Sequence, residues 1–136
     1  MTSAPADPKT IVRSGYDAIS EAYRSDSFPL AGTWYETALR VLDTALLPGS
    51  AVLDLGCGCG VPVAAQLAGS HRVTGVDLSE RQIERARVLV PAAEFVRADM
   101  ASIEFPARSF DAIEQEWFIP EDDGGHAAFF ARVIAP

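Results

Sequence analysis

Residues 54–60, DLGCGCG, place one acid and three glycines on alternate positions of a short loop. Glycine has no Cβ atom and adopts positive φ without steric cost, so a ligand can approach the backbone of such a loop closely. One glycine is enough for most tight turns, yet Gly56, Gly58 and Gly60 are all present. The pattern therefore predicts a binding loop beside Asp54, with a tight turn that holds no ligand as the alternative.

The place of the third glycine bears on the class of ligand. A nicotinamide-dinucleotide fingerprint would have its third glycine at position 61, where this chain has Val61. The third glycine comes one residue early, at Gly60. This spacing favours a different nucleotide-like ligand, and a dehydrogenase is a weaker alternative.

Two further acids close short apolar runs downstream of the loop. RVTGVD ends in Asp77 and EFVRAD ends in Asp99. An acid about 20 residues past a glycine loop is the expected partner of ribose hydroxyls, because a carboxylate can accept two hydrogen bonds from a diol. The alternative for each acid is a cap on the helix or loop that follows it.

The elements that must position these residues follow from the apolar pattern. Short apolar runs at 51–55, 72–77, 94–99 and 110–114 alternate with helical or loop stretches. This alternation predicts an α/β fold, a Rossmann-like doubly wound parallel sheet of about four strands covered on both faces. Ligands of such sheets bind beyond the carboxyl ends of the strands, where the glycine loop would lie.

Helices are predicted at both ends of the chain. Apolar spacing indicates helices over about 9–25 and 34–46 and a final helix over about 123–133. Thr33 with Glu36, and Ser79 with Gln82, resemble capping boxes. We expect one domain overall, with N-terminal cap helices in residues 1–49 and a partial ligand-binding core in residues 50–136.

Composition narrows the class of partner. The chain has 136 residues and a formal net charge of -8, which argues against nucleic acid and favours a small molecule. No signal peptide or run of 18 apolar residues is present in the sequence, so no membrane partner is expected and the cytoplasm is the default location. The two cysteines and two histidines lack zinc-site spacing, so no metal site is predicted.

The loop with its two strand-end acids resembles the first motifs of the class I S-adenosylmethionine-dependent methyltransferases, and the resemblance runs from about residue 10 to the end of the chain. It implies S-adenosylmethionine as cofactor and a small-molecule methyl acceptor. It also implies that Asp77 binds the ribose and that Asp99 receives the adenine amino group. The cofactor-binding residues implied are Tyr16, Tyr23, Asp54, Gly56, Cys57, Gly58, Gly60, Asp77, Leu78, Asp99, Met100 and Glu114.

The tyrosines belong to GYDAISEAY, which resembles the cap segment of many small-molecule methyltransferases. In that family the tyrosines of this segment close over the cofactor. Tyr16 and Tyr23 also share a helical face with Val12 and Ile19, so packing in the core is the alternative for both.

Methyl transfer requires little side-chain chemistry, because the task of the protein is in-line placement of the acceptor and exclusion of water. A hydroxyl acceptor would still need a general base. Glu114, Glu116 and His126 are the candidates, since they follow or lie in the fourth apolar run. The alternatives are solvated or capping glutamates and an exposed histidine in the first turn of the last predicted helix.

The family pattern continues for about three more strands beyond ARVIAP, where this sequence stops. We therefore expect the fourth strand to have an unpaired edge. Three explanations stay open: a homodimer that forms through that edge or through the last helix, a fragment of a longer chain, and a natural remnant of the family fold. The alternative function is a cofactor-binding protein that does not methylate, either as a scaffold or in another S-adenosylmethionine-using reaction.

Overall fold

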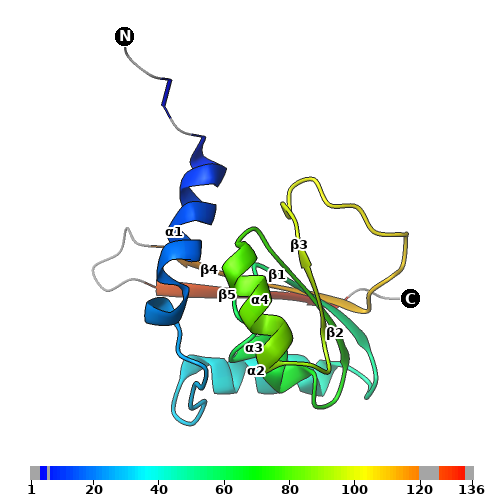
Figure 1. The fold of residues 1–136 in the computed structure, drawn as a ribbon. Helices are drawn as coiled ribbons and strands as arrows, with labels where there is room; N and C mark the ends of the chain where they lie inside the picture. The colour runs from blue at the N-terminus through cyan, green and yellow to red at the C-terminus, as the bar shows by residue number, and fades with distance from the viewer. Residues whose placement is uncertain (1–3, 6, 120–125, 134–136) are drawn as a thin grey trace.

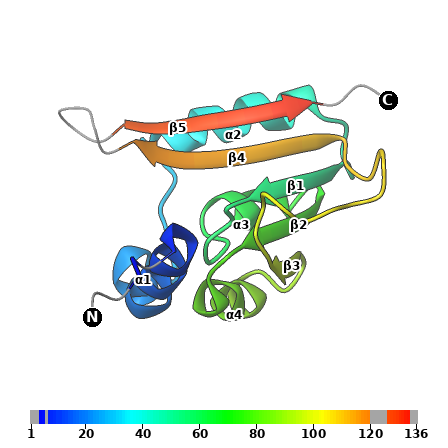
Figure 2. The same cartoon turned by 90° about the horizontal axis from the view of Figure 1, so that it is seen from above.

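The computed structural model describes residues 4–5, 7–119 and 126–133, with side chains as far as Gln115. Five strands of this described chain form one sheet in the order β3-β2-β1-β4-β5 (Figures 1 and 2). The first four are parallel, and the order reverses between β1 and β4, which confirms the predicted Rossmann-like sheet. The strands are β1 Ala51–Leu55, β2 Arg72–Asp77, β3 Glu94–Arg97, β4 Ala112–Ile119 and β5 His126–Val133.

The helices follow the predicted positions near the N-terminus and between the strands. They are α1 Pro8–Tyr23, α2 Trp34–Ala45, α3 Val63–Leu67 and α4 Glu80–Leu89. The side chain of Asp7 caps α1 by accepting from the backbone N–H of Thr10, and a proline occupies the first turn, where its missing N–H is not needed. The connection between β3 and β4 contains turns but no helix.

The two predicted capping boxes form only in part. The hydroxyl of Thr33 donates to the carbonyl of Leu30 at 2.7 Å and does not cap α2, while Glu36 accepts from the backbone N–H of Gly32 at 2.9 Å. At α4, Ser79 Oγ accepts from the backbone N–H of Gln82 at 3.2 Å, as predicted. The side chain of Gln82 does not complete this second box, because it is engaged with α1.

The hydrophobic core lies between the sheet and helices α2, α3 and α4. Leu39 of α2, Leu67 of α3 and Ile83 of α4 are almost completely buried and pack with Val52 and Val73 of the sheet. Full burial of such side chains stabilises the fold by about 1.5–3 kcal/mol each. Helix α1 lies outside this core, beside α4 (Figure 2).

The predicted final helix and the open edge of the fourth strand are both wrong. His126–Val133 is strand β5, which pairs antiparallel with β4 along its full length, from Ala112 opposite Val133 to Ile119 opposite His126. The edge of β4 carries N–H and C=O groups that need partners. An antiparallel strand can return through a connection as short as residues 120–125, whereas a parallel return needs about a dozen residues or more.

This pairing also changes the predicted dimer surface. A homodimer through an exposed β4 edge or a last helix is not available in this arrangement, because β5 covers that edge and replaces that helix.

Within the described residues, no helix combines the length and the apolar character needed to cross a bilayer.

Candidate functional site

A cavity of about 570 Å³ opens at the carboxyl ends of β1, β2 and β3. Its volume lies in the range of pockets for organic ligands, which is roughly 300–1,000 Å³. The glycine loop, the end of β2, the residues after β3 and one face of α1 all contribute to its wall. The predicted residues that line the cavity are Tyr16, Tyr23, Asp54, Gly56, Cys57, Gly58, Asp77, Leu78, Asp99 and Met100.

The end of β2 holds the glycine loop in place. The carbonyl of Val76 accepts from the backbone N–H groups of Gly56 at 2.8 Å and Cys57 at 3.0 Å. Gly56 and Gly58 have φ of +76° and +57°, in the left-handed region that strains residues with a Cβ atom. These two glycines therefore bring bare backbone to the cavity, as the sequence predicted for the loop.

Gly60 has a different environment. It has φ of +83°, and a Cβ atom there would lie 3.0 Å from Val90 Cγ2 and 3.3 Å from Phe95 Cζ. Gly60 does not line the cavity but faces the side chains of the core. Its local role is close packing, and its role in ligand binding stays a prediction.

Asp77 joins the cavity wall to the glycine loop. Its Oδ2 accepts from the backbone N–H of Gly58 and its Oδ1 from that of Ser79, both at 2.9 Å. A carboxylate has about four acceptor sites, so both oxygens can still accept from a ligand. Burial raises the pKa of Asp77, and the hydrogen bonds from backbone N–H groups oppose that rise. Asp77 thus has a local hydrogen-bonding role, the alternative that the sequence left open, and its contact with a ligand stays a prediction.

Asp99 forms an ion pair with Lys9 of α1 and accepts from the backbone N–H of Ala101 at 2.9 Å. The hydrogen bond from Lys9 holds the pKa of Asp99 below its usual value. The pair ties the start of α1 to the residues after β3. Sequence reasoning did not find Lys9, because nothing in the local pattern relates positions 90 residues apart.

The cavity face of α1 carries the two predicted tyrosines. Tyr16 and Tyr23 contact each other edge to face, with ring centroids 5.2 Å apart. Val12 and Arg24 line the same wall. The tyrosines are thus beside the cavity, as the resemblance implies, and not inside the main core.

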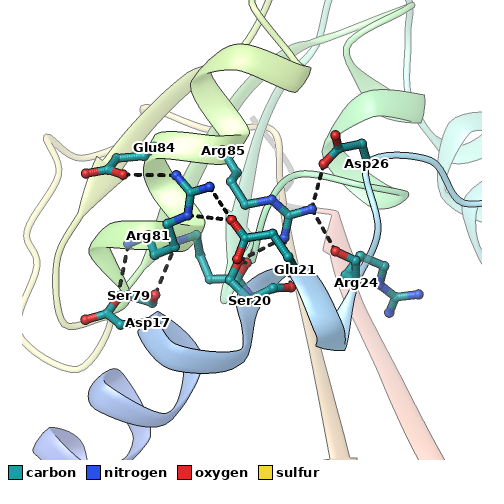
Figure 3. A network of polar contacts seen from close by, with 10 residues as sticks. Asp17, Ser20, Glu21, Arg24, Asp26, Ser79, Arg81, Glu84 and Arg85 are labelled. Carbon is teal, nitrogen blue, oxygen red and sulfur yellow. Dashed lines mark hydrogen bonds and ion pairs between the residues drawn. The ribbon is translucent and has the colours of Figure 1, made fainter.

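Polar contacts fix the other side of α1 to α4 (Figure 3). Asp17 Oδ1 accepts from Ser79 Oγ at 2.6 Å and from the backbone N–H of Arg81 at 3.1 Å, so a side chain of α1 caps α4. The Ser79 hydrogen bond is the largest of the effects that lower the pKa of Asp17. Arg81 also pairs with Glu21 of α1. This network holds α1 against the sheet domain at the edge of the cavity.

The candidate general bases are distributed along β4 and β5. Glu114 is completely buried and is the register partner of Asp54 on β1, but it does not line the cavity. Glu116 lies opposite Phe129, and His126 begins β5 instead of a helix. The side chains of Glu116 and His126 lie outside the described part of the chain, so their catalytic roles stay predictions.

Cys57 and Cys59 are free and buried in the glycine loop. Burial raises the pKa of the Cys57 thiol well above its usual value, and the negative charges of Asp54 and Asp77 add to this rise. The Cys57 side chain therefore lines the cavity as a neutral group at neutral pH.

The sequence matches a family model described as a methyltransferase domain over residues 52–135. This match covers more than half of the 136-residue chain. The chain therefore belongs to the methyltransferase-domain family.

Individual relatives support this assignment. Cycloartenol-C-24-methyltransferase of Arabidopsis thaliana is 32% identical, over 93% of this chain and 44% of the relative. Demethylmenaquinone methyltransferase of Symbiobacterium thermophilum is 31% identical, over 84% of this chain and 50% of the relative. The chain thus spans about half the length of these curated relatives.

Solved structures share the fold. Magnesium protoporphyrin IX methyltransferase from Synechocystis, solved with bound SAH, has a TM-score of 0.66 and 18% identity, over 85% of this chain and 74% of its own. The [4+2]-cyclase SpnF has a TM-score of 0.62 and 20% identity, over 90% of this chain and 65% of its own. At these identities the likeness concerns the fold alone.

Proposed function

We propose that this chain binds S-adenosylmethionine in the cavity beside α1 and acts in the methylation of a small molecule. The observation that carries the proposal is the convergence of the glycine loop, Asp77, Asp99 and the α1 tyrosines on one cavity of about 570 Å³. Within a methyltransferase-domain chain, this is the set of groups that such a nucleoside ligand would need.

The residues present fit this cofactor by their donor and acceptor chemistry. Asp77 keeps free acceptor positions for the protons of a ribose diol. Asp99 is a carboxylate acceptor suited to an adenine amino group, although Lys9 competes for it. Gly56 and Gly58 leave room for a ligand to approach the backbone. When bound, the cofactor supplies an electrophilic methyl group on its sulfonium.

The task of the chain is then to orient both ligands and exclude water. Helix α1 covers one wall of the cavity and is tied to α4 and to Asp99, which suits it to keep water out. Glu114, Glu116 and His126 remain the proposed general bases for an acceptor that has to lose a proton.

The acceptor is proposed to be a small molecule with an apolar skeleton. Val12 and Tyr23 line the cavity and are about half exposed, at 51% and 49%, and Met100, which also lines the cavity, is 42% exposed. Two relatives are named for apolar substrates, cycloartenol and demethylmenaquinone.

We place the protein in the cytoplasm on its sequence features, and any homodimer would have to use a surface other than the β4 edge.

The first test is calorimetric titration with S-adenosylmethionine and S-adenosylhomocysteine. We expect affinity in the micromolar range for wild type and its loss in Asp77→Ala and Gly58→Val. Glu94→Ala is the matched control, because it removes an exposed carboxylate at the amino end of β3, away from the cavity. Absence of binding by folded wild-type protein would refute the cofactor assignment.

A second measurement separates methylation from the alternative function. The same fold serves a [4+2]-cyclase, so the fold does not determine the reaction. Formation of S-adenosylhomocysteine together with a methylated apolar acceptor would support the transferase. Tight cofactor binding without S-adenosylhomocysteine formation across a panel of sterols and quinols would favour a binding protein or another reaction.

A further inference from the structure

Gln82 links helix α1 to the glycine loop inside the cavity wall. It lies in the first turn of α4, is 2% exposed and lines the cavity. Its Oε1 accepts from the hydroxyl of Ser20 on α1 at 2.6 Å. Its Nε2 lies 3.5 Å from the position that a Cβ atom of Gly58 would occupy. One amide group therefore reaches from the cap helix to the loop that approaches the ligand.

The contacts of Ser20 determine which way this amide points. Arg85 Nη1 donates to Ser20 Oγ at 2.9 Å and to the Ser20 carbonyl at 2.8 Å (Figure 3). Arginine has no acceptor, so Ser20 Oγ must accept from it, and the one hydroxyl proton is left for Gln82. The amide oxygen of Gln82 therefore faces Ser20, and its NH₂ group faces Gly58.

Arg85 is itself held firmly at the end of α1. It is 5% exposed, and its Nη2 donates to the carbonyl of Arg24 at 2.7 Å and to Asp26 at 2.9 Å. A buried guanidinium with this many acceptors has little freedom to turn. The orientation of Gln82 is thus fixed by a chain of contacts that begins at the C-terminal end of α1.

A ribose diol needs donors as well as acceptors for full recognition. Its hydroxyl protons can be accepted by Asp77, but its oxygens also accept hydrogen bonds. The backbone N–H of Gly58 is already donated to Asp77. The NH₂ group of Gln82 lies beside the same loop and donates no hydrogen bond to another described side chain.

We propose that Gln82 donates through Nε2 to a hydroxyl oxygen of the bound nucleoside, and that Ser20 and Arg85 are positioning residues for its amide. This inference rests on the proposed function, because it concerns the same ligand. It assigns ligand recognition to α4 and α1 in addition to the strand-end acids. Docking of α1 and ligand affinity are thereby coupled through Ser20.

The test compares S-adenosylhomocysteine with its 2′-deoxy and 3′-deoxy analogues by calorimetry, in wild type, Gln82→Met and Ser20→Ala. The ratio of affinities between the parent and an analogue measures the contribution of one hydroxyl. We expect Gln82→Met to lower that ratio about tenfold for one of the two analogues and to leave the other unchanged. Ser20→Ala should lower the same ratio several-fold, because the amide can then turn.

A merely structural role would weaken all three ligands equally and leave both ratios unchanged, and that outcome would overturn the inference. If Ser20→Ala does not fold, Ser20→Cys keeps the size of the side chain with a weaker donor and is expected to lower the same ratio. Absence of S-adenosylhomocysteine binding by wild type would refute the proposed function and this inference together. Unchanged ratios with tight wild-type binding would refute the inference alone.

Discussion

The glycines of loop 56–60 have different environments, and the substitution Gly60→Ala would separate packing from ligand access. Gly60 has φ of +83°, and the new Cβ atom would lie 3.0 Å from Val90 Cγ2 and 3.3 Å from Phe95 Cζ. Both neighbours are buried, at 4% and 6% exposure, so neither can move away freely. The variant should lose stability while the cavity wall stays unchanged.

The expected loss has two parts. An L-residue in the left-handed region is destabilised by about 1–2 kcal/mol. Overpacking of a well-filled core by one methyl group adds about 1–3 kcal/mol. We therefore expect Gly60→Ala to lower the free energy of unfolding by about 2–5 kcal/mol, which for a domain of this size corresponds to roughly 10–20 °C in Tm.

Urea unfolding followed by circular dichroism would measure this loss, with two glycines as controls. Gly49 has φ of +78° with no atom within 4 Å of a Cβ, so Gly49→Ala reports the backbone strain alone. Gly15 lies within α1 and has equally open surroundings, so Gly15→Ala should stabilise the protein by about 0.5–1 kcal/mol. The difference between Gly60→Ala and Gly49→Ala isolates the crowding.

The result that would refute this reasoning is equal destabilisation of Gly60→Ala and Gly49→Ala, to within about 0.5 kcal/mol. Ligand binding gives an independent check. Folded Gly60→Ala should bind S-adenosylhomocysteine with nearly wild-type affinity. Gly58→Ala should weaken binding, because its Cβ atom would enter the cavity side of the loop, 3.5 Å from Gln82 Nε2.

Three further expectations concern other parts of the molecule. Asp17→Asn keeps an oxygen that can accept from Ser79 and Arg81 but removes the negative charge at the N-terminus of α4, so it should lower stability by about 0.3–1 kcal/mol at pH 7. The pKa of Asp17 in the folded state lies below 3.8. The difference from wild type in urea unfolding should therefore be complete above pH 3.8 and disappear as the pH falls through that lower folded-state pKa. Leu39 is 3% exposed, and Leu39→Ala should reduce the free energy of unfolding by about 2–5 kcal/mol. Leu47 is 81% exposed, and Leu47→Ala should change the free energy of unfolding by less than about 0.5 kcal/mol. Equal effects of the two substitutions would contradict the assigned core. Lys9→Met should tighten binding of S-adenosylhomocysteine at low salt, because it frees Asp99 from its ion pair. The gain in affinity should shrink as salt is added. Weaker binding in this titration would show that Lys9 itself supports the ligand.

Local patterns were sufficient to predict the central part of the fold. The runs that became β1, β2 and β3 are apolar on alternate or successive positions, and each closes on or near an acid or a glycine. Because the carboxyl ends of parallel strands meet at one edge, the acids at those ends converge even though they are distant in sequence. This geometry is why the sequence alone is enough to place Asp54, Asp77 and Asp99 together.

The last segment could not be predicted in this way. Residues 126–133, HAAFFARV, combine alanines with two phenylalanines and suit a helix or a strand. The choice depends on the edge of β4, whose backbone groups are paired when this segment lies beside them. No property of the segment itself contains that information, so local propensity gave a helix where strand pairing decides the outcome.

The polar contacts of α1 show the same limit within the candidate site. Ser20 and Arg85 are 65 positions apart, and neither has a sequence context that distinguishes it from an ordinary polar residue of an amphipathic helix. Ser20 becomes completely buried only when α1 docks on α4, and its hydroxyl then has to satisfy both a buried cation and an amide. The strand-end acids follow from the topology of the sheet, whereas the orientation of Gln82 follows from how a separate helix is attached to it. Ligand affinity should therefore depend on α1 even for variants that leave every strand-end acid in place.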